Sequence, residues 1–176
     1  MSVLQVLLEE EVDLSVIHAN DATPIQHLPL ASARMHVGFI VPDLDLAMDQ
    51  YGRLYGWKWT RTVRVHHELK GPCASEEELY VAFATGSPMI ELIEDRPGSI
   101  WSAGASPLHH LGCWVTDLEE AGDILTREGF EFCGRGRRVG TRRFAYAIYR
   151  NCDGLLLEIQ DARFERGWRS LVAAAR

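Results

Sequence analysis

The chain has 176 residues, which is enough for one domain with a substantial core or for two small, tightly joined domains. Hydrophobic residues make up 47% of the chain and charged residues 24%, a composition typical of a globular protein and not of a disordered or fibrous one. The formal net charge of −7 disfavours a phosphate backbone as the main partner, so we expect no nucleic-acid partner. No apolar stretch reaches the length of a membrane span, so we expect no membrane partner either.

The N-terminal segment, residues 1–34, is an extension to which we assign no structure. It begins MSVLQVLLEEEVDL, which lacks the basic start and the small-residue cleavage site of a secretory signal. Cysteines 73, 113, 133 and 152 form neither a CxxC pair nor a zinc-type spacing. Reduced thiols in the cytoplasm fit this pattern better than a disulfide framework, so we predict a cytoplasmic protein.

Residues 35–95 have the pattern of one strand, one helix and three further strands. HVGFIV is short, apolar and partly β-branched, which indicates a buried strand. Asp43 is placed as the N-cap of a helix, and Gly56 as its C-terminal stop. The strand-like segments KWTRTVRVHHEL, EELYVAFAT and PMIELIED follow, separated by turns rich in Gly and Pro.

Residues 108–162 repeat this pattern after a linker at 96–107 that is rich in Pro, Gly, Ser and Ala. HLGCWVTDLEEAGDILTR aligns without gaps to HVGFIVPDLDLAMDQYGR and matches it at eight of the 18 positions. The strand-like segments FEFCGRGR, RRFAYAIYR and GLLLEIQDA complete the second copy. We therefore predict an α+β fold of two tandem βαβββ modules, followed at 163–176 by a C-terminal helix.

The repeat places a histidine and a glutamate at equivalent positions in each module. His36 and His110 open the first strand, and Glu91 and Glu158 lie in the apolar last strand. A single strand histidine is more often a core or edge residue, and a single strand glutamate more often faces solvent. An ionised carboxylate is rarely buried unless it is paired or bound to a metal, however, and here the pair occurs twice. We therefore predict that the four residues bind one divalent ion, which zinc, nickel, cobalt, manganese or iron could each supply.

Other histidines and a group of arginines have less certain roles. Strand alternation points His109 away from His110, so we expect it to be structural or exposed, and we expect His67 to be a surface or packing residue. The stretch GRGRRVGTRR holds five arginines, which form either a solvated hairpin or a clamp for an anionic substrate. Arg143 and Tyr146 are the substrate-binding candidates, although Tyr146 could equally be a core aromatic.

The two HxG strands with their DLxxA helices, together with the glutamate pair, resemble the vicinal oxygen chelate (VOC) superfamily, which includes glyoxalase I, methylmalonyl-CoA epimerase, extradiol dioxygenases and bleomycin-resistance proteins. The resemblance covers roughly residues 35–162, and the order SPMIELIED, then SPLHHLGCWVTDLEEA, is most similar to the epimerase and glyoxalase branch. It implies a curved mixed β-sheet, or half-barrel, around the metal and a homodimer. It also implies His36, Glu91, His110 and Glu158 as ligands, although epimerases usually have Gln at the position of Glu91.

The resemblance implies an isomerase, epimerase or lyase that acts through a metal-stabilised enolate on a small carbonyl or acyl-thioester substrate. Glu158 or Glu91 is then the catalytic base, with Glu158 favoured. One alternative is an extradiol-type ring-cleaving dioxygenase, which uses two histidines and one carboxylate on iron and leaves Glu91 without a role. A second is a non-catalytic binding protein of the resistance type, a class that lacks the four ligands.

Overall fold

The computed structural model describes residues 28–85, 89–104 and 106–174. The first module comprises β1 (Leu30–Val41), α2 (Leu44–Tyr55), β2 (Val63–Lys70), β3 (Ser75–Phe83) and β4 (Met89–Glu94). The second comprises β5 (Leu108–Val115), α3 (Leu118–Arg127), β6 (Glu131–Arg138), β7 (Tyr146–Arg150) and β8 (Leu156–Asp161). A short 3₁₀ turn, η2 (Ala162–Phe164), leads into α4 (Glu165–Ala174). The α+β class is therefore confirmed.

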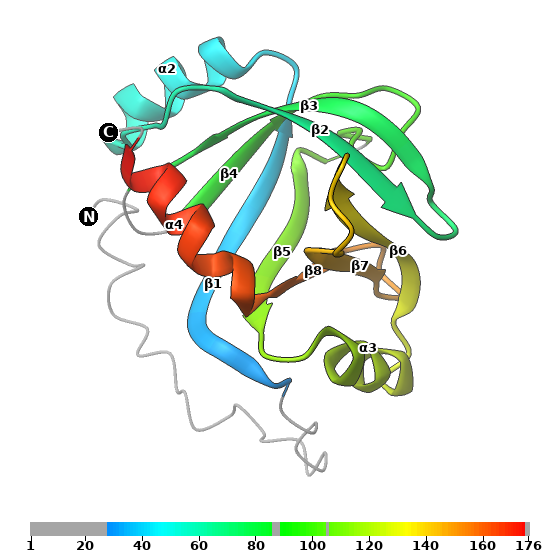
Figure 1. Ribbon diagram of the computed structural model, residues 1–176. Coiled ribbons are helices and arrows are strands. Elements are labelled where there is room, and N and C mark those ends of the chain that lie inside the picture. The colour runs from blue at the N-terminus through cyan, green and yellow to red at the C-terminus, as the bar shows by residue number, and fades with distance from the viewer. Residues whose placement is uncertain (1–27, 86–88, 105, 175–176) are drawn as a thin grey trace, which may run out of the picture.

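The eight strands form a closed barrel in the order β1-β4-β3-β2-β6-β7-β8-β5 (Figure 1). In each module the first and last strands are parallel neighbours, and the other neighbours are antiparallel. The two modules join at two places. There β1 pairs antiparallel with β5, and β2 pairs antiparallel with β6. The curved sheet that we expected as a half-barrel thus closes completely, since the β2–β6 pairing satisfies two edges that would otherwise be unpaired.

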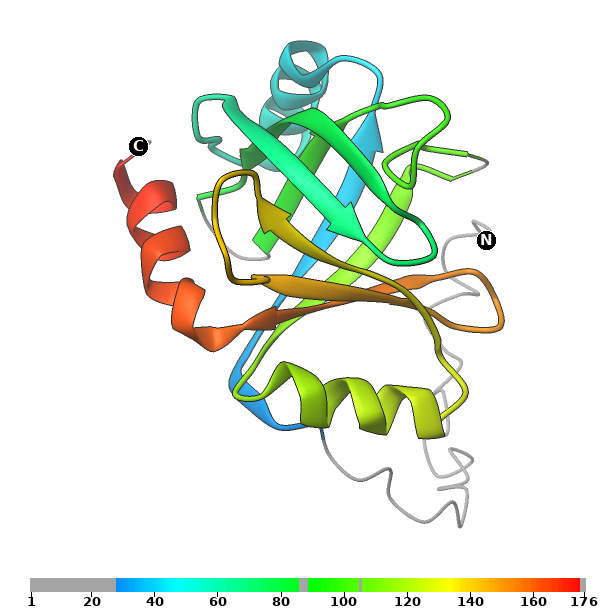
Figure 2. The ribbon, with the colours of Figure 1, turned by 45° about the vertical axis from the view of Figure 1, so that its right-hand side comes forward.

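The helix α2 begins after Asp43 and ends at Gly56, as the sequence predicts, and α3 begins in the same way after Asp117. The Asp43 carboxylate accepts a hydrogen bond from the Leu46 N–H at 2.8 Å, and Asp117 accepts from the N–H groups of Glu119 and Glu120. Gly56 ends α2 in the left-handed conformation, at φ 70°. Each helix packs on the strands of its own module, outside the barrel (Figure 2).

The barrel interior holds an apolar cluster to which the strands of both modules contribute. Trp101, from the segment between the modules, belongs to this cluster and is only 3% exposed, so the segment expected to be a linker also supplies a core residue. Trp168 of α4 packs against the same cluster, with its ring 5.4 Å from Phe83 and 5.9 Å from Trp114. The helix α4 therefore covers one side of the barrel.

Several strand boundaries differ from the sequence prediction, and two of them have a clear structural reason. The first strand begins at Leu30 and not at His36, and the first module therefore begins before residue 35, because the early part of the strand pairs with the end of β5 through Leu30 and Val115. The strand β7 begins at Tyr146, because residues 139–145 form the loop after β6. The rest of the N-terminal extension, residues 1–27, lies outside the described residues. Within the described segments, no helix is long and apolar enough to cross a bilayer.

Candidate metal centre

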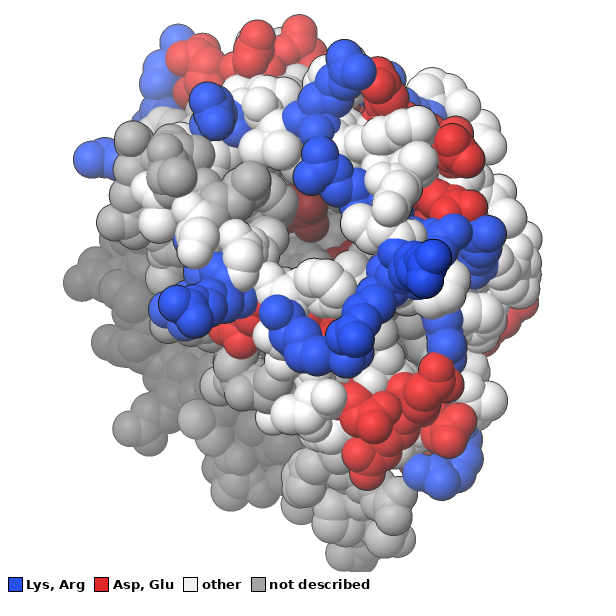
Figure 3. All heavy atoms as spheres, in the orientation of Figure 1, with Lys and Arg blue, Asp and Glu red and all other residues white. Residues whose placement is uncertain are grey.

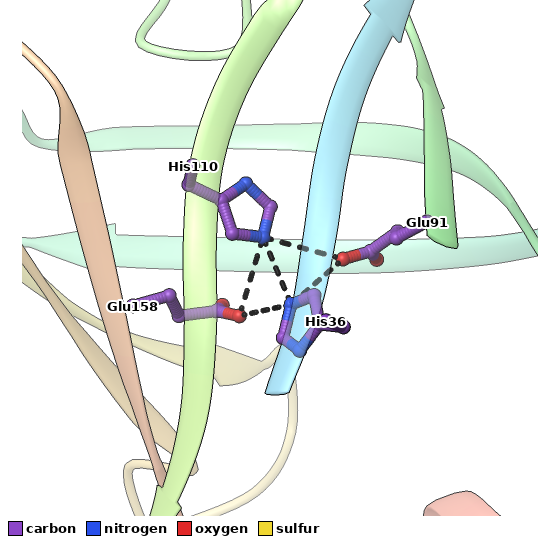
Figure 4. A group of neighbouring side chains, drawn as sticks. All are labelled: His36, Glu91, His110 and Glu158. Atoms are coloured by element: carbon purple, nitrogen blue, oxygen red, sulfur yellow. Dashed lines mark hydrogen bonds and ion pairs between the residues drawn. The ribbon is translucent and has the colours of Figure 1, made fainter. Parts of the chain in front are cut away.

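The four predicted ligands lie on four neighbouring strands and point to one place inside the barrel (Figure 4). His36 is on β1, Glu91 on β4, His110 on β5 and Glu158 on β8. The two carboxylates approach from opposite sides, with the two imidazoles between them. Strands that the internal repeat makes equivalent thus carry equivalent candidate ligands.

The strand register explains why these side chains meet. Across the antiparallel β1–β5 pair, His36 lies opposite Gly112, and Gly38 lies opposite His110. Across the parallel pairs, Gly38 lies beside Glu91, and Gly112 lies beside Glu158. Residues paired across strands point to the same side of a sheet, as do residues two apart along a strand. All four ligands therefore face the barrel interior at the same level.

The glycine of each HxG motif makes room for the histidine of the other module. A Cβ on Gly112 would lie 1.8 Å from Cε1 of His36, and one on Gly38 would lie 2.1 Å from Cε1 of His110. No side chain larger than hydrogen fits at either position while the imidazoles keep these places. The repeated His-x-Gly spacing is thus a packing requirement of the site itself.

The spacing of the donor atoms fits a single metal ion. Nε2 of His36 lies 3.0 Å from Nε2 of His110, and 3.4 Å and 3.2 Å from the nearest oxygens of Glu91 and Glu158. Nε2 of His110 lies 3.4 Å and 3.6 Å from the same oxygens, and all four donor atoms lie within 4.8 Å of one another. Bonds of about 2.1 Å place neighbouring donors about 3.0 Å apart in an octahedron and about 3.4 Å apart in a tetrahedron. Two imidazoles and two carboxylates also suit the chemistry of a divalent ion.

The side chains of the cluster are held by strong electrostatic interactions in a buried place. His36, His110 and Glu158 are 3%, 2% and 5% exposed. Burial disfavours the charged form of His36, but hydrogen bonds and the charges of Glu158 and Glu91 outweigh it and raise its pKa to about 10. Burial likewise opposes ionisation of Glu91, yet the two histidines hold the pKa of its carboxyl below the usual value. The site therefore stabilises the carboxylate of Glu91 through positive neighbours, a role that a divalent cation can also take.

His109 orients His110, one of the four predicted ligands, a contact that sequence reasoning missed. It is buried, and its Nε2 lies 2.7 Å from the carbonyl oxygen of Ile100. A carbonyl only accepts, so Nε2 of His109 carries the proton and its Nδ1 accepts the hydrogen bond from Nδ1 of His110, 2.9 Å away. This chain of hydrogen bonds leaves a lone pair on Nε2 of His110, which faces the other ligands. Burial lowers the pKa of His109 to about 4 and keeps it neutral.

Gln160 makes a hydrogen bond to Glu158, one of the two carboxylates of the cluster. Its side-chain amide donates a hydrogen bond of 2.8 Å to the oxygen of Glu158 that faces the histidines. Gln160 lies two residues after Glu158 on β8, so strand alternation, which places both on one face, could have identified it. Nothing in the sequence near His109 indicated Ile100, because the contact depends on how the segment between the modules folds.

The two predicted substrate-binding residues, Arg143 and Tyr146, lie in different environments in the structure. Tyr146 is half-buried against the interior cluster, where its ring stacks on His67 at 5.4 Å. Arg143 is exposed and lines a surface pocket with Phe144 and Arg163, a pocket that includes none of the four ligands. Among the other arginines of the hairpin, Arg135 forms a bidentate pair with Glu119 and Arg137 pairs with Glu68. Figure 3 shows the face of the molecule that is turned to the viewer in Figure 1. This face has a hollow with acidic side chains at its bottom and basic ones around it.

The sequence matches the family model of the Glyoxalase/Bleomycin resistance protein/Dioxygenase superfamily over residues 35–146. This chain belongs to that superfamily, as the fold and the site also indicate. A search of curated proteins found no match to the sequence.

Similar solved structures include methylmalonyl-CoA epimerases. A variant of the Streptomyces coelicolor enzyme in complex with 2-nitronate-propionyl-CoA has a TM-score of 0.51 and 17% identity, over 77% of this chain and 95% of that one. A methylmalonyl-CoA epimerase in complex with methylmalonyl-CoA and NH4+ has a TM-score of 0.50 and 16% identity, also over 77% and 95%. At these identities the similarity establishes the shared fold.

Proposed function

We propose that this chain is a divalent-metal-dependent isomerase or epimerase, or a lyase of the glyoxalase type, that moves a proton at the carbon beside a substrate carbonyl. The convergence of His36, Glu91, His110 and Glu158 on one point inside the barrel carries this proposal. Membership of the superfamily supports it, because glyoxalases belong to that superfamily. We propose an acyl thioester or a small carbonyl compound as the substrate, since the similar structures include an epimerase bound to methylmalonyl-CoA.

The four residues would hold the ion, and the two glutamates would also handle the proton. A bound divalent ion would supply Lewis acidity, which makes the C–H beside a carbonyl more acidic. Glu91 and Glu158 approach from opposite sides (Figure 4), so a carbon between them could lose a proton on one face and regain it on the other. We favour Glu158 as the base, since Gln160 fixes the orientation of its carboxylate.

The presence of the fourth donor favours this chemistry over the two alternatives. An iron-dependent extradiol dioxygenase needs two histidines and one carboxylate. Here the carboxylate of Glu91 lies 3.4 Å from both imidazoles, as close as a ligand would be to them. A resistance-type binding protein lacks this set of residues, whereas this chain keeps all four.

Metal binding is the first test. We expect the purified protein to bind one equivalent of a divalent ion, and we expect His110→Ala and Glu91→Gln to weaken that binding by about 100-fold or more. Glu94→Gln is the matched control, because Glu94 lies on the same strand but pairs with Arg96 outside the cluster. If the wild-type protein takes up no divalent metal under any loading condition, the proposal fails.

Proton exchange is the second test. Metal-loaded protein is incubated in D2O with methylmalonyl-CoA or with the hemithioacetal of methylglyoxal and glutathione, and mass spectrometry follows deuterium incorporation into substrate and product. We expect Glu158→Gln to slow incorporation by about 100-fold, the usual effect of losing a general base. Incorporation that is equally fast in chelated protein or in Glu158→Gln would contradict the proposed roles, and oxygen uptake with catechols would favour the dioxygenase.

A further inference from the structure

His67 lies on the barrel wall across from the two histidine ligands. It belongs to β2, which the strand order separates from β1 by two strands and from β5 by three. Its neighbours two residues away, Val65 and Leu69, pack in the interior cluster, so His67 also faces the interior, and it is only 3% exposed. Of the two positions expected for His67, at the surface or packed inside, the structure shows the packed one.

The ring of His67 is fixed in place by aromatic neighbours. It stacks on Tyr146, with ring centroids 5.4 Å apart and an interplanar angle of 16°, and meets Trp101 edge-on at 5.5 Å. Trp101 also lies edge-on to the ligand His110, at 6.3 Å. The ring of Trp101 therefore lies between His67 and His110 of the candidate metal centre and contacts both.

Several buried polar atoms of this wall have no partner within the described part of the chain. They are both ring nitrogens of His67, Nε1 of Trp101 and one carboxylate oxygen of Glu77. Glu77 is the cross-strand partner of His67, so both side chains point to the same side of the sheet. Most buried polar atoms in proteins make hydrogen bonds, so a cluster of four atoms that lack them indicates a place for a polar ligand group.

The donors and acceptors of this cluster define the kind of group that fits. Burial lowers the pKa of His67 to about 4, so at neutral pH its imidazole offers one N–H and one lone pair. Trp101 can only donate a hydrogen bond, and an ionised Glu77 can only accept one. An uncharged group that both donates and accepts, such as an amide or a hydroxyl, matches this set, whereas the charge of Glu77 would repel a carboxylate.

We propose that His67, Trp101 and Glu77 form a second polar subsite, which binds an uncharged amide or hydroxyl of the substrate while its carbonyl end lies at the metal centre. This inference rests on the proposed function for the carbonyl end only. His67 is then a specificity-determining residue, and the preferred substrates carry an amide or hydroxyl beyond the reacting carbon. Thioesters of amide-bearing thiols and hemithioacetals with a free hydroxyl both belong to this class.

The test compares two probes of similar length on the metal-loaded full-length protein. One is the propionyl thioester of N-acetylcysteamine, which contains an amide, and the other is the propionyl thioester of 1-pentanethiol, which does not. Binding is measured by ligand-observed NMR, and metal affinity by competition with a chromophoric chelator. We expect the wild-type protein to bind the amide probe at least about tenfold more tightly, because unpaired polar groups reject an analogue that lacks the matching group.

Two variants assign the effect to His67. His67→Phe keeps a ring to stack on Tyr146 but removes both nitrogens, so we expect it to lose the preference while metal affinity stays unchanged. His67→Gln keeps a donor and an acceptor, so we expect it to retain part of the preference. Should His67→Phe not fold, the ¹⁵N shifts of the His67 ring in the wild-type protein provide the same test, since the amide probe must move them and the alkyl probe must not.

Two outcomes would overturn the inference: equal binding of both probes by the wild-type protein, or a preference that persists in His67→Phe. An amide-bearing probe that binds without shifting the His67 nitrogens would also overturn it and would indicate that the subsite holds water only. Failure of the proposed function would look different, because the protein would then bind no metal or catalyse no proton exchange, whatever residue stands at position 67.

Discussion

Replacing Gly112 with alanine tests the reciprocal packing of glycine and histidine on which the candidate metal centre depends. The new Cβ would lie 1.8 Å from Cε1 of His36, whereas ordinary contact begins at 3.4 Å. The imidazole must therefore retreat by about 1.6 Å, the difference between these two distances. Metal–ligand bonds tolerate only about 0.2 Å, so His36 can no longer be a ligand in its present place.

We expect two measurable effects from Gly112→Ala. Metal affinity falls by about 100-fold or more, because one of the four donors is displaced. The free energy of unfolding falls by about 1–3 kcal/mol, the usual effect of overpacking a closely packed interior. By the symmetry of the two modules, Gly38→Ala acts in the same way on His110, since its Cβ would lie 2.1 Å from that ring.

The assays are chelator competition for metal affinity and urea denaturation of the metal-free protein for stability. Gly167→Ala is the control, because nothing lies within 4 Å of a Cβ at that position. A double-mutant cycle with His36→Ala identifies the cause: once the ring is gone, Gly112→Ala loses most of its effect on stability. If Gly112→Ala binds metal like the wild-type protein, or destabilises the His36→Ala background just as much, the packing argument is wrong.

Three further predictions address other features of the molecule. His109→Phe removes the acceptor for Nδ1 of His110, so metal affinity falls by about 10- to 100-fold while the fold persists; an unchanged affinity would contradict the orienting role. His67 has a folded pKa of about 4 against 6.5 when unfolded, so unfolding takes up a proton and stability falls as the pH drops from about 6.5 towards 4. This amounts to about 2 kcal/mol between pH 7 and pH 5, and denaturation at both pH values must show a smaller loss in His67→Phe. Light scattering after size exclusion tests the homodimer that the family resemblance implies, and a mass of one chain would contradict it.

The parts of the structure that the repeat encodes could be predicted from the sequence. The strands that carry the candidate ligands and the close approach of His36 to His110 follow from matching two copies of one motif, and the caps of α2 follow from Asp43 and Gly56. The motif is short and occurs twice in the sequence, so an assignment made in one copy is supported by the same assignment in the other. The closure of the sheet was not predicted, because β2 and β6 pair through segments that are not alike in the two modules.

The roles of some residues that are not repeated in both modules could not be predicted from the sequence. His109, Trp101 and His67 have no counterpart in the other module, and their roles depend on the segment between the modules, which supplies both Ile100 and Trp101. A Pro- and Gly-rich segment indicates only a connection, and its course over the barrel is decided by tertiary packing. The sequence left His67 as either a surface or a packing residue, although its alternating neighbours Val65 and Leu69 point inward with it.

The symmetric and asymmetric parts of the site therefore have different consequences for function. The four candidate ligands, the two glycines and their register are repeated, and together they form a group that could hold one metal between two opposed carboxylates. A symmetric site alone cannot distinguish one end of a substrate from the other. The unpaired additions, His109 beside one ligand and His67 with Trp101 on the opposite wall, are the features that break this symmetry. We therefore expect substitutions of His67 and Trp101 to change substrate preference. We expect metal binding to change with substitutions of the four repeated candidate ligands, and also of His109, because it orients His110.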